Sequence, residues 1–313
     1  MSASASHLRP RTVTELIDAG IQLARAHYGP LAVLSAIVAL PGLVINIINS
    51  QLLPAAQPAS EVAGSFLRIL PLTLVGVCLT AIGFGALIAS ASAAYLTGQA
   101  LEPGTALRLA LGRAGRLVGA KLLAYAIMGG GFIVTGVALA VLLPAILAGG
   151  GQNVGLGVVA ALAMLGGVVG ALVWLAIALP RYANVTPAVM LEDAGVLQAL
   201  RRSRELSRGS ARRILGLLAL LFGIGFVLTI MVGEVVAAVF DNRTLANAIG
   251  GFVVVPLYPP AAAVLTLLYY DLRIRREGYD IEMMAAGLGD LPAAAPPSGA
   301  APAGEVGTGQ PSF

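Results

Sequence analysis

The chain has 313 residues, of which 58% are hydrophobic and only 11% are charged. Soluble domains carry about 25% charged residues, so this composition excludes an ordinary soluble protein. The net charge of +4 therefore does not indicate nucleic-acid binding, but basic loops on the cytoplasmic side of a membrane.

Charged residues are segregated along the chain, and the stretches between them are long enough to cross a bilayer. Residues 122–180 contain no Asp, Glu, Lys or Arg, and a membrane-spanning helix needs about 20 mostly apolar residues. We predict an all-α, polytopic membrane bundle over residues 12–284, between a flexible N-terminus (1–11) and a disordered tail rich in Ala, Gly and Pro (285–313). The six spans are expected near residues 31–48, 69–95, 122–143, 154–179, 214–240 and 245–270. Residues 148–153 are expected to form the turn between spans three and four.

The distribution of basic residues predicts the topology. All 19 basic residues except Arg68 and Arg243 fall on one side of the predicted spans. The positive-inside rule then places both termini in the cytoplasm. Every basic residue except Lys121 is arginine, a bias that we associate with bacterial coding, and we expect a multi-pass protein of the bacterial inner membrane.

Each predicted hairpin is preceded by a segment with the features of an amphipathic surface helix. Thr12 and Glu15 fit a capping box, and Gly29-Pro30 is expected to end this first helix. The second helix is expected to begin at Glu102-Pro103, with the proline in its first turn, and the third near Gly195. This order suggests a three-fold repeat of surface helix plus hairpin.

The loop between spans four and five is the strongest candidate for a binding surface. On one helix, arginines spaced three and four residues apart would form a stripe, with two more beside it. These candidate contacts are Arg201, Arg204, Arg208 and Arg212 for the stripe, and Arg202 and Arg213 beside it. The stripe could bind anionic lipid or an acidic partner protein, or serve only as a topology signal; a helix break at Gly209 would spoil it.

Prolines interrupt the first and last spans. Pro41 lies in span one, and Pro256, Pro259 and Pro260 lie near the middle of span six. Interrupted helices form substrate sites in transporters, but they also occur as plain kinks, which is the reading that we favour here. Gly166 and Gly170 form a G-x-x-x-G pair in span four, for which we expect internal packing rather than dimerisation.

The sequence lacks the common catalytic and metal-binding motifs. It has no nucleophile elbow, phosphate-binding loop or zinc-protease motif, and its two histidines, His7 and His27, have no further ligands at useful spacing. We expect no enzyme activity, no cofactor and no metal.

Two segments carry a resemblance to a known family. One contains PAVMLE at residues 187–192, ALRRS at 199–203 and LSRGSARR at 206–213, and the other reads LLYYDLRIRREGYD at 267–280. Together they resemble the bacterial membrane proteins named after the membrane domain of glycerophosphoryl diester phosphodiesterases. The resemblance implies a six-helix membrane module without the catalytic barrel, and therefore carries over no catalytic residue.

We therefore expect a non-catalytic scaffold or accessory component that engages anionic lipid or a membrane protein partner through its basic loops. The alternative is a transporter or lipid-handling protein that uses the kinked spans one and six. The oligomeric state does not follow from the sequence.

Overall fold

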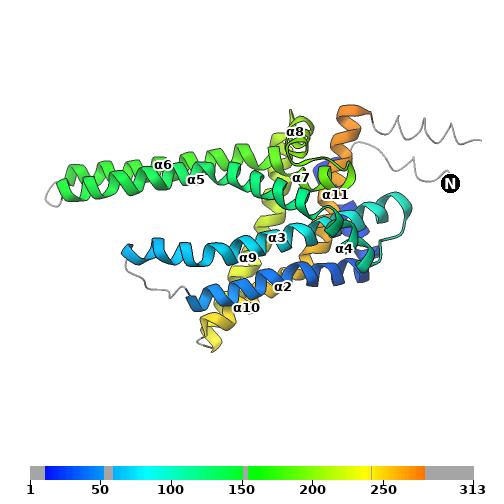
Figure 1. Ribbon diagram of the computed structural model, residues 1–313, viewed down its shortest axis with the longest axis horizontal. Coiled ribbons are helices and arrows are strands. Elements are labelled where there is room, and N and C mark those ends of the chain that lie inside the picture. The colour runs from blue at the N-terminus through cyan, green and yellow to red at the C-terminus, as the bar shows by residue number, and fades with distance from the viewer. Residues whose placement is uncertain (1–10, 53–58, 151–153, 241, 279–313) are drawn as a thin grey trace, which may run out of the picture.

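The computed structural model describes residues 11–52, 59–150, 154–240 and 242–278, and all regular structure in these ranges is helical (Figure 1). The elements are α1 (Val13–Ala26), α2 (Tyr28–Leu52), α3 (Ala59–Thr97), α4 (Pro103–Gly112), α5 (Ala114–Gly150), α6 (Val154–Tyr182), α7 (Val185–Leu191), α8 (Val196–Ser207), α9 (Ala211–Phe240), α10 (Arg243–Val253), the 3₁₀ helix η2 (Val255–Leu257) and α11 (Tyr258–Glu277). The predicted all-α fold class is confirmed.

Six helical stretches of the described residues are long and apolar enough to cross a membrane. They are Tyr28–Ile45, Arg68–Thr97, Ala114–Ala138, Ala161–Leu191, Ala211–Phe240 and Thr244–Glu277. The prediction of a multi-pass membrane protein is confirmed. The turn expected at residues 148–153 is partly wrong, because α5 remains helical to Gly150, and residues 151–153 lie outside the described ranges. The predicted tail at 285–313 and nearly all of the predicted N-terminal segment also lie outside them.

Three surface helices begin where the sequence predicts. The Thr12 side chain accepts a hydrogen bond from the Glu15 backbone, and the Glu15 side chain accepts one from the Thr12 backbone, so the capping box is formed. Pro103 opens α4, and Gly195 precedes α8. The predicted end of α1 is wrong: α1 ends at Ala26, and Pro30 lies in the first turn of α2, where its missing N–H removes no helical hydrogen bond. The short helix α7 was not predicted.

The surface helices pack in a cyclic order. α1 packs on α11, α4 packs on α3, and α8 contacts α6 together with α5 and α7. Each surface helix and the hairpin that follows it form a unit: α1 with α2 and α3, α4 with α5 and α6, and α8 with α9 to α11. Each surface helix therefore contacts the last membrane helix of the preceding unit, and α1 of the first unit contacts α11 of the third. The third unit differs from the other two because its second span is divided into α10, η2 and α11. The order of surface helix and hairpin thus occurs three times, as the repeat hypothesis expects.

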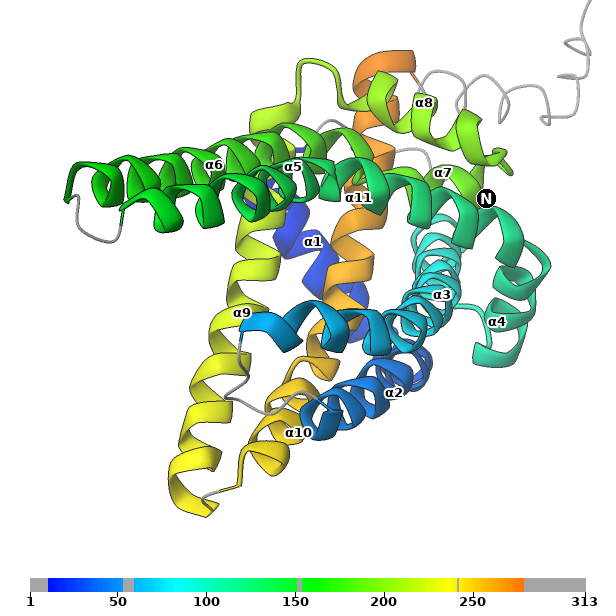
Figure 2. The same ribbon diagram turned by 60° about the vertical axis from the view of Figure 1, so that its left-hand side comes forward.

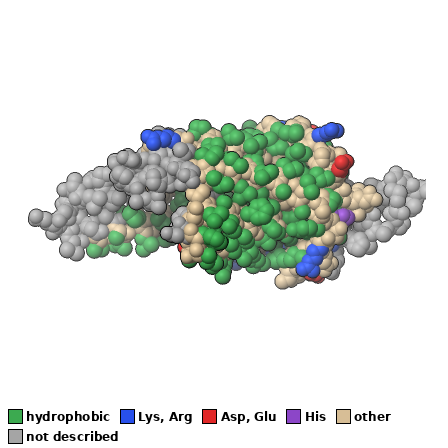
Figure 3. Space-filling model, turned by 90° about the horizontal axis from the view of Figure 1, so that it is seen from below, with side chains coloured by type: hydrophobic (Ala, Val, Ile, Leu, Met, Phe, Trp, Pro, Cys, Tyr) green, Lys and Arg blue, Asp and Glu red, His purple; other side chains and the backbone are tan. Residues whose placement is uncertain are grey.

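The helices α1, α4, α7 and α8 and the last turns of α11 form one end of the bundle, which we call the basic end. From it the α5/α6 hairpin projects separately, whereas the α2/α3 hairpin and the α9/α10 pair stay together, because α10 packs against α2 (Figure 2). The hydrophobic core lies towards the basic end, where Leu16, Leu87, Leu117 and Leu268 are at most 1% exposed. Apolar side chains cover the face in Figure 3, and the charged side chains visible there lie at its margins.

The predicted helix interruptions have different outcomes. α2 continues through Pro41, where one helical hydrogen bond is missing. Span six is broken at η2, which contains Pro256. Pro259 and Pro260 do not kink a helix, because they lie in the first turn of α11, where backbone N–H groups have no helical acceptor.

Candidate functional site

The predicted arginine stripe does not exist as one helical face. α8 ends at Ser207, Arg208 caps it, and Gly209 adopts a φ of 72°, a left-handed conformation that favours glycine. Arg212 belongs to the next helix, α9. The stripe prediction is therefore wrong, because the chain turns between Arg204 and Arg212. The six arginines instead divide into two, Arg202 and Arg213, that form partly buried ion pairs and four that remain exposed.

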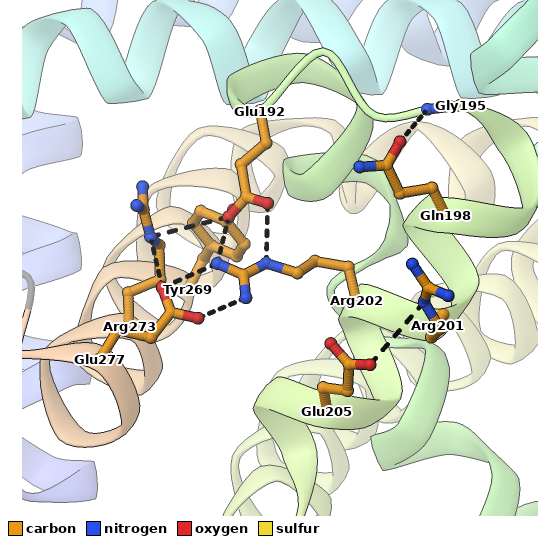
Figure 4. Close-up of polar contacts among 9 residues, drawn as sticks. All are labelled: Glu192, Gly195, Gln198, Arg201, Arg202, Glu205, Tyr269, Arg273 and Glu277. Atoms are coloured by element: carbon orange, nitrogen blue, oxygen red, sulfur yellow. Dashed lines mark hydrogen bonds and ion pairs between the residues drawn. The ribbon is translucent and has the colours of Figure 1, made fainter.

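Arg202 lies at the centre of the first ion-pair cluster, which we call the Glu192 cluster (Figure 4). Its Nε and Nη2 atoms donate to the two Glu192 oxygens at 2.7 and 2.9 Å, and Nη2 also donates to Glu277 at 2.7 Å. The Nε atom of Arg273 lies 3.6 Å from Glu192 and 3.3 Å from Glu277. The Tyr269 hydroxyl donates to Glu192. The cluster thus joins α8, α11 and the end of α7.

The charges of the Glu192 cluster balance one another. Two carboxylates face two guanidinium groups, and hydrogen bonds from Arg202 to Glu277 and Glu192 raise the pKa of Arg202, so this side chain remains charged. The four charged side chains are only 18–28% exposed. Glu192 also accepts a hydrogen bond from the Tyr269 hydroxyl. A neutral, hydrogen-bonded cluster of this kind holds helices together and leaves little free charge for a ligand.

Asp271 forms the second cluster and is 2% exposed. It accepts hydrogen bonds from Arg213 at 2.6 Å, from Arg275 at 2.9 Å and from the Arg11 backbone N–H at 2.7 Å. Both guanidinium groups also donate to the Arg11 carbonyl oxygen. The Asp271 cluster therefore connects α9, α11 and the chain leading into α1, and its buried carboxylate is fully compensated.

A third ion-pair site lies on the loop between α7 and α8. Asp193 lies 2.7 Å from Arg113 and 3.0 Å from Arg116, and its backbone carbonyl accepts a further hydrogen bond from Arg116 at 2.8 Å. Hydrogen bonds from Arg116 and then Arg113 lower the pKa of the Asp193 carboxyl group. This exposed site connects the loop to the start of α5.

Four of the predicted arginines remain at the surface, and we call Arg201, Arg204, Arg208 and Arg212 the exposed arginines. Arg201 makes only a long 3.8 Å ion pair with Glu205 in the same helix. Arg204 donates to the Tyr182 hydroxyl at 2.5 Å and lies over the Tyr182 ring, 5.1 Å from its centroid. In the part of the chain that the structure describes, no carboxylate pairs with Arg204, Arg208 or Arg212.

A cavity of about 300 Å³ lies between α3, α5, α6, α9 and α11, and we call it the central cavity. Its lining is mostly apolar, with polar groups from Thr80, Lys121, Tyr125, Tyr182 and Tyr258. A second cavity of about 260 Å³ lies between α3, α9, η2 and α11. The two share four lining residues: Phe84, Phe222, Tyr258 and Leu265.

The cavities do not lie where the sequence placed a transport path. That path was expected between spans one and six, but α2 contributes no residue to either cavity. Span six does contribute, through residues beside Pro256 such as Leu257 and Tyr258. The helix break at η2 therefore contributes to a cavity wall, whereas the proline in span one, Pro41, lies in a helix that lines neither cavity.

Sequence reasoning missed the acidic partners of the arginines. Glu192 and Asp271 both lie in the segments that carry the family resemblance, and the fold brings these segments together across more than 70 residues of sequence. A count of acidic residues within those segments would have suggested the pairing. No family model, no curated protein and no solved structure matches this chain. The family resemblance therefore remains a prediction.

Proposed function

We propose that the chain is a non-catalytic scaffold of the bacterial inner membrane, with both termini cytoplasmic, and that its basic end binds anionic lipid headgroups. The observation that carries the proposal is the division of the arginines. Two are neutralised within ion-pair clusters, whereas the exposed arginines project from helices that these clusters hold in place. Each basic residue near an anionic surface contributes about 1 kcal/mol of attraction.

The position of α8 supports this function. Its Leu200 and Leu206 side chains are buried against the bundle, so the helix is held at the edge of the membrane region rather than free in solution. Its exposed side carries Arg201 and Arg204. Positive charge held at this level meets the headgroups of the cytoplasmic leaflet, whose surface potential is negative.

The test is to replace Arg201, Arg208 and Arg212 with glutamine in the full chain and extract it in native-membrane polymer discs. Arg204 is retained because it packs on Tyr182. We expect the fraction of anionic lipid in the discs to fall relative to wild type, and the wild-type enrichment to weaken at high salt, because exposed charges are screened. A Glu205→Gln variant is the control and should retain the enrichment. Equal enrichment in the triple variant and the wild type would overturn the proposal. A protein that copurifies in stoichiometric amount with the wild type but not with the triple variant would show that the exposed arginines bind a partner protein and not lipid.

A second candidate, lipid handling, is favoured by the central cavity and its continuation between α9 and α11. Reconstitution into vesicles with fluorescent phospholipid in one leaflet would measure it. Lipid movement faster than in protein-free vesicles would favour lipid handling, whereas equal rates would favour the scaffold.

A further inference from the structure

Lys121 stands apart from the other basic residues of the chain. It is the only lysine among the 19 basic residues and lies on α5, just before the predicted span at 122–143 but inside the membrane-spanning stretch Ala114–Ala138 of the structure, on the wall of the central cavity. Its side chain is half-buried, and its Nζ atom lies 5.5 Å from the centroid of the Tyr125 ring. Among the described residues no carboxylate forms an ion pair with it. An uncompensated cation facing an apolar space within a membrane protein is costly, and such residues mark ligand sites.

A second cation contacts a residue of the cavity wall. Tyr182 lines the central cavity, and the Arg204 guanidinium group both hydrogen bonds to its hydroxyl and stacks over its ring. Lys121, which is the charged residue of the cavity lining, and Tyr182 both lie in the part of the cavity nearest the basic end, since Lys121 lies two turns after the start of α5 and Tyr182 is the last residue of α6. The positive charge of the cavity is therefore concentrated at one of its ends.

The opposite part of the cavity is apolar and continues towards the membrane interior. Phe84, Phe222 and Leu265 line both cavities. α9 packs on α10 and α6 instead of along α11, and the second cavity lies in the space that this leaves. Sites that bind small molecules have volumes of about 300–1,000 Å³ and are mostly apolar with a few polar groups, which fits the two cavities taken together.

We propose that the central cavity binds a single anionic phospholipid, with its phosphate at Lys121 and one acyl chain along Phe84, Phe222 and Leu265. The charge at one end requires an anion, and the apolar continuation requires a hydrocarbon chain. A phospholipid of the surrounding bilayer supplies both. This site is separate from the headgroup binding proposed for the exposed arginines, because it holds one lipid inside the bundle and does not gather many around its edge.

The first experiment measures retained lipid on the full chain by native mass spectrometry, after washing in neutral detergent. We expect the wild type to retain one anionic phospholipid per chain and Lys121→Gln to retain at least tenfold less. Lys121→Arg should retain it, because the cation remains. Arg108→Gln, which removes an exposed charge from α4 at the same end of the bundle, is the matched control and should also retain it. Equal retention by Lys121→Gln and the wild type, or no bound lipid in the wild type, would overturn the proposal.

A second experiment does not depend on the folding of the lysine variant. Phe84→Trp places a fluorophore in the cavity, and the single natural tryptophan, Trp174, provides the background signal in the wild type. Brominated acyl chains quench tryptophan on contact. We expect a low fraction of brominated anionic phospholipid to quench the added fluorescence more strongly than the same fraction of brominated neutral phospholipid. Equal quenching by both would identify an apolar gap filled by any lipid and overturn the anionic site.

The two proposals fail separately. The variant with Arg201, Arg208 and Arg212 replaced is expected to lose lipid enrichment in discs but retain the single bound lipid, and Lys121→Gln is expected to do the opposite.

Discussion

The basic end and the projecting α5/α6 hairpin are both helical, but they are held together in different ways. At the basic end, side chains such as Leu87, Leu117 and Leu268 are buried, and three ion-pair sites connect helices far apart in sequence. Along the hairpin, Val134 is 70% exposed, Ile133 64% and Leu165 61%. The difference indicates that the bundle is fixed at one end, while the hairpin presents its apolar surface to lipid.

The membrane explains this contrast. Lipid is as apolar as leucine, so apolar side chains of the hairpin gain little by packing against another helix, and close contact must come from small residues and hydrogen bonds. Such contacts join the two helices of the hairpin, where Gly131 faces Trp174, Gly167 faces Thr135, and the Trp174 indole donates to the Ile127 carbonyl at 2.9 Å. At the basic end, by contrast, charged groups can pair across helices.

The largest expected effect is the loss of the buried carboxylate at the basic end. Asp271→Asn removes the negative charge that compensates Arg213 and Arg275, and we expect it to lower the free energy of unfolding by about 3 kcal/mol. Unfolding in mixed micelles with increasing SDS measures this change. The control, Glu205→Gln, removes only an exposed pair and should cost less than about 0.5 kcal/mol. Similar effects of both substitutions would remove the distinction between buried and exposed ion pairs.

An intermediate effect, of opposite sign in the two regions, is expected from adding one methyl group to a glycine. At Gly20, on α1, a Cβ atom would lie 2.3 Å from Val264 Cγ2 and 3.0 Å from the Val264 backbone, so Gly20→Ala should separate α1 from α11 and destabilise by about 1–3 kcal/mol. At Gly170, on α6, nothing lies within 4 Å, and Gly170→Ala should stabilise by up to about 1 kcal/mol through helix propensity. The same SDS titration measures both. Destabilisation by Gly170→Ala would show that this face is covered, for example by a second copy of the chain.

The smallest expected effect concerns pH and the exposed Asp193 site. Because the pKa of this carboxyl group is lowered in the fold, its contribution to stability is complete above its ordinary pKa of about 4 and is lost as the pH falls through the lowered value. Asp193→Asn keeps a residue type that tolerates the φ of 56° at this position. We expect the wild type to melt at a higher temperature than this variant at pH 7, and the gap to narrow progressively as the pH is lowered below the ordinary pKa of the carboxyl group. A gap that stays constant with pH would contradict the role of the charge.

The glycine pair of span four shows a limit of sequence reasoning. Internal packing was expected for Gly166 and Gly170, but both face open space within this chain, and the neighbouring Gly167 makes the close contact instead. That expectation is wrong because the G-x-x-x-G spacing identifies a flat helix face but not which face meets α5. Gly166 and Gly167 are one residue apart, which corresponds to a rotation of about 100° around the helix. The packing of α6 on α5 decides which of the two glycines faces α5.

The sequence by itself determined the helical class, the six spans and the starts of the three surface helices. These follow from local properties, namely the length of uncharged stretches and the capping residues, which act within a few turns. Only the tertiary structure decided which arginines are paired with carboxylates, because Glu277 reaches Arg202, and Asp271 reaches Arg213, across long separations in sequence. It also placed the central cavity, since five helices, α3, α5, α6, α9 and α11, contribute its lining. Burial and pairing are properties of side chains brought together by packing, which no single segment of the chain contains.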